Sequence, residues 1–191
     1  QAAAERELLV APQLFHAFAA GQPSIAEVTI TPKRGRACNE LTQFRYDVVL
    51  STASPAVPAN ALPGRDWTEH GLSVPRLRQQ LRDEAPEVLR VARIPNARTE
   101  RAVSALRCLD QDPPATAGEL RRALDQLPMV GVDPEDLWAL CDDVRYAVDL
   151  SWTEGRSDGA FDVTFRRRDA LESACHDTGE PAASMDPTDP T

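Results

Sequence analysis

The sequence predicts an α+β protein, with an antiparallel strand pair near the N-terminus and a small helix-covered sheet further along the chain. Two kinds of pattern carry this prediction. Apolar residues fall at every second position in several short segments, which is typical of half-buried strands. Elsewhere a capping residue precedes apolar residues at a spacing of three or four, which indicates amphipathic helices.

The N-terminal strand pair is expected at residues 28–31 and 44–50, which are joined by a polar connection containing Gly35. This connection is too long for a two-residue hairpin turn, and it can project polar side chains away from the strands. Apolar side chains alternate with polar ones in both strands, at Val28, Ile30, Phe44, Tyr46, Val48 and Leu50.

Helices are expected before this strand pair. Residues 1–10 predict a short helix that ends in apolar residues. Pro12 suits the first turn of a second helix, which would carry Phe15 and Phe18 on one side. Gly21 is a typical residue for the end of that helix.

Two segments of the chain differ from the rest in composition, and they divide the chain into four parts. Residues 51–66 contain three prolines, a glycine and small residues, which favours a linker or surface loop. We therefore expect residues 1–50 to hold the strand pair with its helices and residues 67–168 to form a second α+β unit. Residues 169–191 are acidic, rich in Pro, Ser and Thr and poor in apolar residues, so we expect this tail to be disordered.

The second unit has helix and strand signals of its own. Helices are expected after Ser73, after Thr116 with Glu119 three residues later, and after Asp133, because these residues are strong N-caps. A helix from about Asn96 to Leu109 is expected, with Val103, Leu106 and Leu109 in register on it. Strands are expected at 88–94, 146–152 and 161–165. These elements predict a sheet of about three strands with helices packed on one face.

The net charge of −9 is unevenly distributed along the chain. Six negative charges lie after Arg168, in the tail, so residues 1–168 carry only about −3. An acidic chain argues against a nucleic-acid partner, because binding the phosphate backbone requires clustered Lys and Arg. No apolar run is long enough to span a bilayer, and the first residues lack the order of a signal peptide. We therefore expect a cytoplasmic protein without a nucleic-acid or membrane partner.

The four cysteines do not predict a metal site. No two of them form a CxxC pair, whereas structural zinc sites use closely spaced pairs. Free thiols are the expected state of Cys38, Cys108, Cys141 and Cys175.

Three segments carry a family resemblance: "ERELLVAPQLFHAFA", "KRGRACNELTQFRYDVVL" and "RIPNAR". Together they resemble the C-terminal part of the S-adenosylmethionine-dependent methyltransferase domains of nonribosomal peptide and polyketide synthetases. The resemblance covers residues 1–168, and the nearly contiguous run "NELTQFRYDVVL" gives it most weight. It implies that the N-terminal strand pair closes the sheet of a class I methyltransferase.

The resemblance also implies a cofactor and partners. The cofactor would be S-adenosylmethionine, and the substrate would be an intermediate tethered to a carrier protein, with N-methylation as the first expectation. Neighbouring synthetase domains would be the other partners. No GxGxxG-like run and no βαβ unit before residue 25 are present, so the cofactor-binding half is expected to lie upstream and this chain alone is expected to be inactive.

The sharpest candidates for the substrate side are Asn39 and Glu40. An amide and a carboxylate in the polar connection could orient an amine or a thioester carbonyl, and Glu40 could accept a proton. The alternative is structural: Asn39 and Glu40 cap local backbone groups, or Glu40 pairs with Arg36 or Arg45. Arg45 and Tyr46 are weaker substrate-binding candidates. In a strand, Arg45 would pair with Asp47 or with a neighbouring strand, and Tyr46 would pack in the core with its hydroxyl at the edge.

A function of a different class also fits the sequence. Residues 67–168 could form a non-catalytic docking or scaffolding platform that contacts neighbouring synthetase domains. The absent cofactor half is compatible with both functions.

Overall fold

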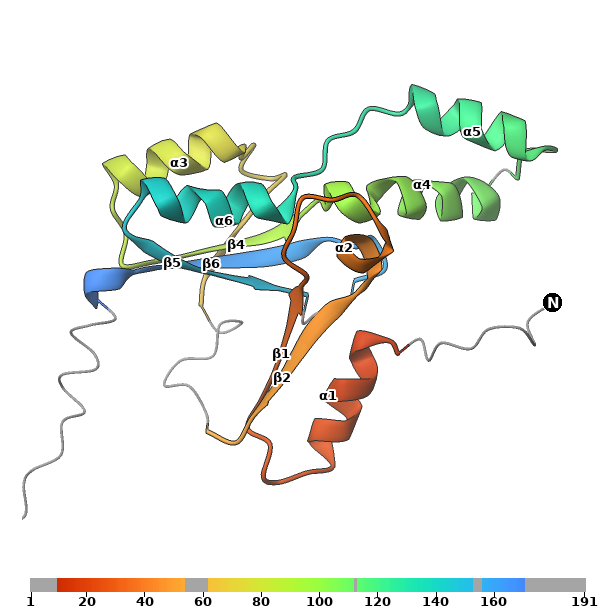
Figure 1. Ribbon diagram of the computed structural model, residues 1–191. Coiled ribbons are helices and arrows are strands. Elements are labelled where there is room, and N and C mark those ends of the chain that lie inside the picture. Colours follow the sequence, from red (N-terminus) through yellow and green to blue (C-terminus); the bar gives the residue numbers. More distant parts are fainter. Residues whose placement is uncertain (1–9, 54–61, 112, 153–155, 171–191) are drawn as a thin grey trace, which may run out of the picture.

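The computed structural model describes residues 10–53, 62–111, 113–152 and 156–170. Its core is a four-stranded sheet covered by helices, and a separate two-stranded hairpin leaves one end of that sheet (Figure 1). The structure therefore confirms the α+β class. The expected helix at 1–10 lies almost entirely outside the described residues, as do most of the acidic tail and part of the turn before the last strand.

The four-stranded sheet has the order β3-β4-β6-β5. The strands span β3 Gly64–Asp66, β4 Val88–Ile94, β5 Tyr146–Ser151 and β6 Phe161–Arg167. β6 runs antiparallel to both β4 and β5, whereas β3 runs parallel to β4. The prediction of about three strands missed β3, because this strand has only three residues, and it lies at the end of the segment assigned to the linker.

A bulge distorts β4 where it pairs with β6. The register shifts between Val91 and Ile94, and Arg93 takes the left-handed conformation with φ 57°. The backbone N–H of Arg93 donates to Asp162 on β6 at 2.9 Å. The second carboxylate oxygen of Asp162 accepts from Arg90 at 2.5 Å, so one buried carboxylate stabilises the irregular segment.

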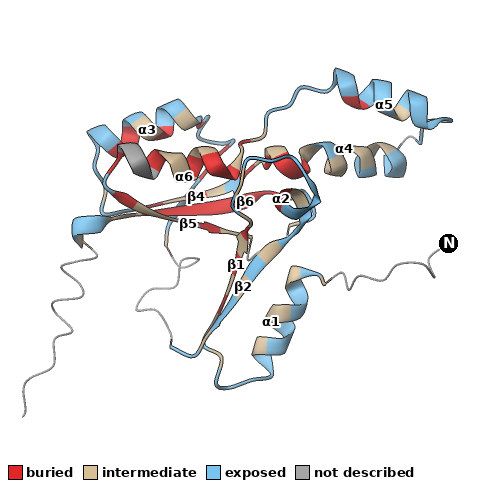
Figure 2. Cartoon of the chain, viewed as in Figure 1, coloured by how far each residue is buried: buried red, intermediate tan, exposed pale blue. Residues whose placement is uncertain are grey.

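The hydrophobic core lies between the sheet and two helices, α3 (Val74–Asp83) and α6 (Pro134–Asp143). Figure 2 shows the buried residues concentrated in this layer. Both helices begin where the sequence predicted, at the N-caps Ser73 and Asp133. The fully buried side chains of this layer are those of Leu77, Leu81, Leu137, Leu140, Val91, Ile94, Leu150, Phe161, Val163 and Phe165.

Two further helices extend beyond the core. These are α4 (Ala97–Gln111) and α5 (Ala117–Gln126), which pack against each other (Figure 1). The capping box of Thr116 and Glu119 at the start of α5 is confirmed. The helix expected from about Asn96 to Leu109 is confirmed as α4, and of its apolar residues in register Leu106 and Leu109 are exposed.

The N-terminal strand pair is confirmed. β1 (Glu27–Pro32) pairs antiparallel with β2 (Tyr46–Ser51). The connection between them, residues 33–45, is called the elbow below. It contains a short helix, α2 (Glu40–Phe44), so the prediction that Phe44 and Arg45 continue the strand is wrong. The cap at Asn39 favours a helical turn here and ends it at Arg45, whose backbone is extended.

The hairpin has little core of its own. β1 buries Val28, Ile30 and Pro32, whereas the preceding helix α1 (Pro12–Ala20), which begins and ends as predicted, buries no residue. The hairpin contacts the main sheet where the backbone N–H of Trp152 donates to the Ile30 carbonyl at 2.7 Å. Apolar side chains remain exposed on α1, α2 and β2, namely Leu14, Phe18, Leu41, Phe44, Val49 and Leu50.

The predicted division of the chain at residues 51–66 stays a prediction. Residues 54–61 lie outside the part of the chain that the structure describes. The hairpin and residues 67–168 contact each other through β1 and β5 and through the elbow.

Core packing around β6 gives a first prediction. Phe165 has an exposed fraction of 0%, so Phe165→Ala should lower the free energy of unfolding by about 3–5 kcal/mol. Leu106→Ala is the control, since Leu106 is 67% exposed and should change stability by less than about 0.5 kcal/mol. Urea denaturation followed by circular dichroism measures both values, and equal losses would contradict the assigned core.

Candidate functional site

The elbow is organised by a local capping box. The Asn39 side chain accepts a hydrogen bond from Thr42 N–H at 3.2 Å, and the Thr42 hydroxyl accepts from Asn39 N–H at 3.3 Å. The Thr42 hydroxyl itself donates to the Ala37 carbonyl. Thr42 is buried under the elbow, so these contacts fix the first turn of α2 in spite of its short length.

Gly35 allows a sharp bend in the part of the elbow that directly follows β1. Its φ of 126° lies in a region that L side chains rarely adopt. The bend lets both backbone groups of Gly35 point toward the second half of the chain. Its N–H donates to Glu135 at 2.6 Å, and its carbonyl accepts from Arg98 at 2.5 Å.

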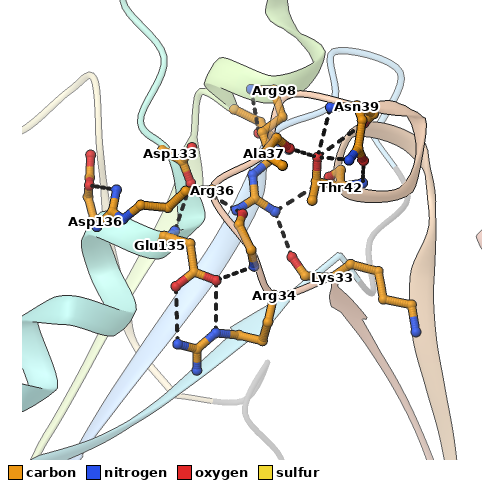
Figure 3. A network of polar contacts seen from close by, with 12 residues as sticks. Lys33, Arg34, Arg36, Ala37, Asn39, Thr42, Arg98, Asp133, Glu135 and Asp136 are labelled. Carbon is orange, nitrogen blue, oxygen red and sulfur yellow. Dashed lines mark hydrogen bonds and ion pairs between the residues drawn. The ribbon is translucent and has the colours of Figure 1, made fainter.

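Arg98 lies behind the elbow at the first turn of α4, with only 5% of its side chain exposed. Its guanidinium donates to three elbow carbonyls: Lys33 at 2.6 Å, Gly35 at 2.5 Å and Thr42 at 3.4 Å. It also donates to Asp133 at 2.9 Å, which supplies the opposite charge (Figure 3). A buried arginine therefore connects both arms of the elbow with the start of α6.

The backbone brings Asp133 and Arg98 together. Residues 95–97 run beside Val132, which donates to the Pro95 carbonyl at 2.7 Å and accepts from Ala97 at 3.1 Å. Gly131 makes this approach possible, because an added Cβ would lie 2.4 Å from the Ala97 nitrogen.

Glu135 forms the second link between the elbow and α6. Both of its carboxylate oxygens accept from Arg34, at 2.9 and 3.1 Å, and the Arg34 guanidinium lies 4.4 Å from the centre of the Trp138 ring. Burial acts to raise the pKa of Glu135, and the hydrogen bonds from Arg34 and Gly35 N–H more than offset it. The pKa of Glu135 therefore lies below its ordinary value.

Two exposed ion pairs flank these links. Arg36 contacts Asp136 at 2.9 Å, and Lys33 pairs with Asp47 on β2. Such exposed pairs contribute little to stability. The buried contacts of Arg98 and Glu135 therefore dominate the attachment of the elbow.

The candidate residues Asn39, Glu40 and Arg45 all lie on the exposed side of the elbow. The Glu40 side chain is 67% exposed and pairs with Arg45 at 3.2 Å, one of the two arginine partners considered from the sequence. Asn39 caps α2, as its structural interpretation expected. Roles of these residues toward a substrate stay predictions.

Tyr46 lies apart from these three residues, at the start of β2. Its ring contacts Phe15 of α1 edge-on, with 6.3 Å between ring centres, and its hydroxyl donates to the Val10 carbonyl. Burial raises the pKa of Tyr46. Tyr46 thus attaches α1 to the hairpin, and the interpretation of this residue as a packed side chain fits that position.

The sequence analysis missed Arg98, Glu135 and the bridging role of Asp133. Arg98 ends the "RIPNAR" segment, which entered the sequence analysis only through its family resemblance. Asn96 caps α4, since its side chain accepts from Arg98 N–H at 3.0 Å. Asp133 was recognised only as a helix cap, because nothing in the local pattern links it to residues 35 positions away.

A separate polar hollow of about 520 Å³ lies at the carboxyl ends of β3 and β4. Its lining includes Asp66, Glu69, Arg93, Asn96 and Ser104. Arg93 pairs there with both Asp66 and Glu69, so the charges of the hollow are largely satisfied within the protein.

Within the described ranges, no group of three or more His, Cys, Asp or Glu side chains is placed to hold a metal ion. Cys38 and Cys108 are free. No helix in the same ranges is both long and apolar enough to cross a lipid bilayer.

The chain is similar to segments of very large biosynthetic proteins. It is 37% identical over 163 residues to chondramide synthase cmdD of Chondromyces crocatus, a match that covers 83% of this chain. It is 31% identical over 175 residues to cyclosporin synthetase simA of Tolypocladium inflatum, and 30% identical over 172 residues to nonribosomal peptide synthetase asqK of Emericella nidulans. These matches cover 84% and 86% of this chain.

These comparisons place the relatives of the chain among the nonribosomal peptide synthetases. The chain spans only 4%, 1% and 7% of the lengths of the three relatives named above. No family model matches the chain.

Attachment of the elbow should depend on pH through Glu135. Because the folded pKa of Glu135 is lowered, its stabilisation is fully present above the unfolded value of about 4.3 and is lost as the pH falls through the folded value. Glu135→Gln should therefore cost about 1–2 kcal/mol at pH 7, and the difference from wild type should shrink below about pH 4.3. Urea denaturation from pH 3 to 8 measures this.

Asp136→Asn is the matched control for this prediction. Asp136 lies in the same first turn of α6 as Glu135. Asp136→Asn therefore removes a carboxylate at the same end of the helix dipole but none of the contacts that Glu135 makes. A smaller loss than for Glu135→Gln is expected, and equal losses in the two variants would contradict the role of Glu135.

Proposed function

We propose that this chain is the C-terminal, substrate-side part of an S-adenosylmethionine-dependent methyltransferase domain in a nonribosomal peptide synthetase. The substrate would be the amine of an aminoacyl or peptidyl group tethered to a carrier protein. Similarity to nonribosomal peptide synthetases supports this proposal, and so do the residues that resemble such methyltransferase domains. The structural observation that supports it is the outer edge of β2, which is unpaired among the described residues.

The hairpin has the features of a sheet edge that accepts another strand. Among the described residues, β2 pairs only with β1, so the outer backbone groups of β2 have no strand beside them. Val49 and Leu50 of β2 are 55% and 40% exposed, and Leu14 and Phe18 of α1 are also exposed. A two-stranded sheet is marginal by itself, which favours completion by preceding parts of a larger sheet.

The described residues do not form a site that fits S-adenosylmethionine. A βαβ unit is present, from β3 through α3 to β4, but no glycine-rich turn follows β3. Asp66 at the end of β3 accepts from Thr68 and Glu69 N–H groups and pairs with Arg93, so it is not available to a ribose. The proposal therefore assigns the cofactor to upstream residues.

On the substrate side, this chain would contribute binding and orientation. Glu40 and Arg45 lie on the exposed surface of the elbow. The buried side chain of Arg98 holds the backbone of the elbow through hydrogen bonds to its carbonyl groups. A carboxylate in this position can bind an ammonium group or accept its proton, and loss of that proton is required before an amine can act as a nucleophile. Glu40 is therefore the residue proposed to bind the ammonium group or to accept its proton.

A docking or scaffolding module is the second candidate. The main sheet with α3 and α6 has a continuous buried core, which supports a unit that could serve neighbouring domains without catalysis. On this alternative the exposed apolar residues of the hairpin would bind another domain, and no cofactor would be needed.

Cofactor binding separates the two candidates. Labelled S-adenosylmethionine is titrated against the 191-residue chain and against the synthetase polypeptide extended upstream by about one domain length. Saturable binding by the extended form alone is expected. Binding by neither form would favour the scaffolding module, and tight binding by the shorter chain would contradict the assignment of the cofactor to upstream residues.

Glu40→Gln in the extended form tests the substrate side. Loss of a general base should lower kcat by about 100-fold while cofactor affinity is unchanged. The exposed Glu40–Arg45 pair is worth at most about 1 kcal/mol, and a 100-fold effect corresponds to about 2.7 kcal/mol, so loss of the pair alone cannot explain it. Glu87→Gln, a similarly exposed carboxylate, is the control, and unchanged turnover in Glu40→Gln would remove Glu40 from catalysis.

A further inference from the structure

We propose that Arg98 is a positioning residue, through which the second half of the chain keeps the elbow in the conformation that presents Asn39 and Glu40. The part of this inference that concerns catalysis rests on the proposed methyltransferase function. The part that concerns the conformation of the elbow rests on the structure alone.

The contacts of Arg98 reach both arms of the elbow. Lys33 and Gly35 belong to the arm that leaves β1, and Thr42 belongs to α2, which leads into β2. Their carbonyl groups point inward to one planar guanidinium, which offers donors in several directions at once. If this guanidinium is removed, these carbonyls lose a common partner in a buried position, and the two arms are no longer tied to each other.

Arg98 is itself fixed by the second half of the chain. Asp133 balances its charge and also accepts from Glu135 N–H at 2.9 Å as the cap of α6. The backbone of Arg98 is held by the side chain of Asn96. Its position is therefore determined by residues of α4 and at the start of α6, and not by the hairpin.

The conformation of the elbow determines where Asn39 and Glu40 lie. The Thr42 hydroxyl and the Asn39 side chain form the cap of α2, while the Thr42 carbonyl accepts from Arg98. Glu40 is the first residue of α2. A shift of Thr42 relative to Gly35 would therefore move Glu40 as well. Small displacements of this kind are costly for catalysis.

Hydrogen exchange of the 191-residue chain, read by mass spectrometry, tests the conformational part. Arg98→Lys keeps the charge but replaces the planar group, and Arg98→Ala removes both. Exchange of the amides in residues 35–45 should accelerate at least 10-fold in either variant, while amides in β4 and β6 exchange as in wild type. Arg101→Ala is the control, because Arg101 lies on the same helix and, among the described residues, makes an exposed pair with Asp125 alone.

Three results would overturn this part of the inference. Exchange in the elbow could be unchanged, it could accelerate by the same factor as in β4 and β6, or Arg101→Ala could have the same effect. The second result would mean that Arg98 contributes only to global stability. If Arg98→Ala does not fold, Arg98→Lys and Asp133→Asn, which keeps an oxygen to cap α6, provide the same comparison.

Turnover of the extended synthetase tests the catalytic part. Arg98→Lys should lower kcat for methylation at least 10-fold and leave the affinity for S-adenosylmethionine unchanged, because the contacts of Arg98 within the described residues are with the elbow, Asn96 and Asp133. Unchanged kcat with a loosened elbow would overturn the positioning role. Absence of methylation in the wild-type protein would overturn the proposed function instead, and the exchange experiment would still decide whether Arg98 holds the elbow.

Discussion

The attachment of the hairpin to the rest of the protein depends on a buried guanidinium. Removing the charge of Arg98 from water is costly, and the structure offsets this cost with Asp133 and with the carbonyl groups of Lys33, Gly35 and Thr42. Because these partners come from three separate segments, the interaction connects α4, α6 and the elbow. Removing the guanidinium would leave all of these acceptors without their common donor, and removing Asp133 would leave a buried charge without its counter-ion.

The consequences of this connection are greatest for the N-terminal part. The hairpin and α1 bury few side chains, whereas the layer formed by the main sheet, α3 and α6 buries many. The main polar attachments of the hairpin are the contacts at Arg98 and Glu135 and the backbone hydrogen bond between Trp152 and Ile30. Among the described residues, no strand pairs with the outer edge of β2.

This asymmetry gives the proposed function a structural rationale. One side of the hairpin is attached to a well-packed unit, and the other side has the exposed apolar residues expected of a surface that another part of a synthetase covers. The elbow lies between the two sides. Glu40 lies there on the exposed surface, in an elbow whose backbone the packed unit holds through Arg98.

The sequence by itself determined the elements whose signals are local. The strand alternation in β1, β5 and β6 and the caps Ser73, Thr116 and Asp133 each involve residues within a few positions, so the class of the fold and most helix starts could be predicted. Tertiary structure alone decided the rest. Arg98 joins residues 56 to 65 positions away, and the short strand β3 is ordered only by pairing with β4, because hydrogen bonds between distant segments leave no periodic trace in the sequence.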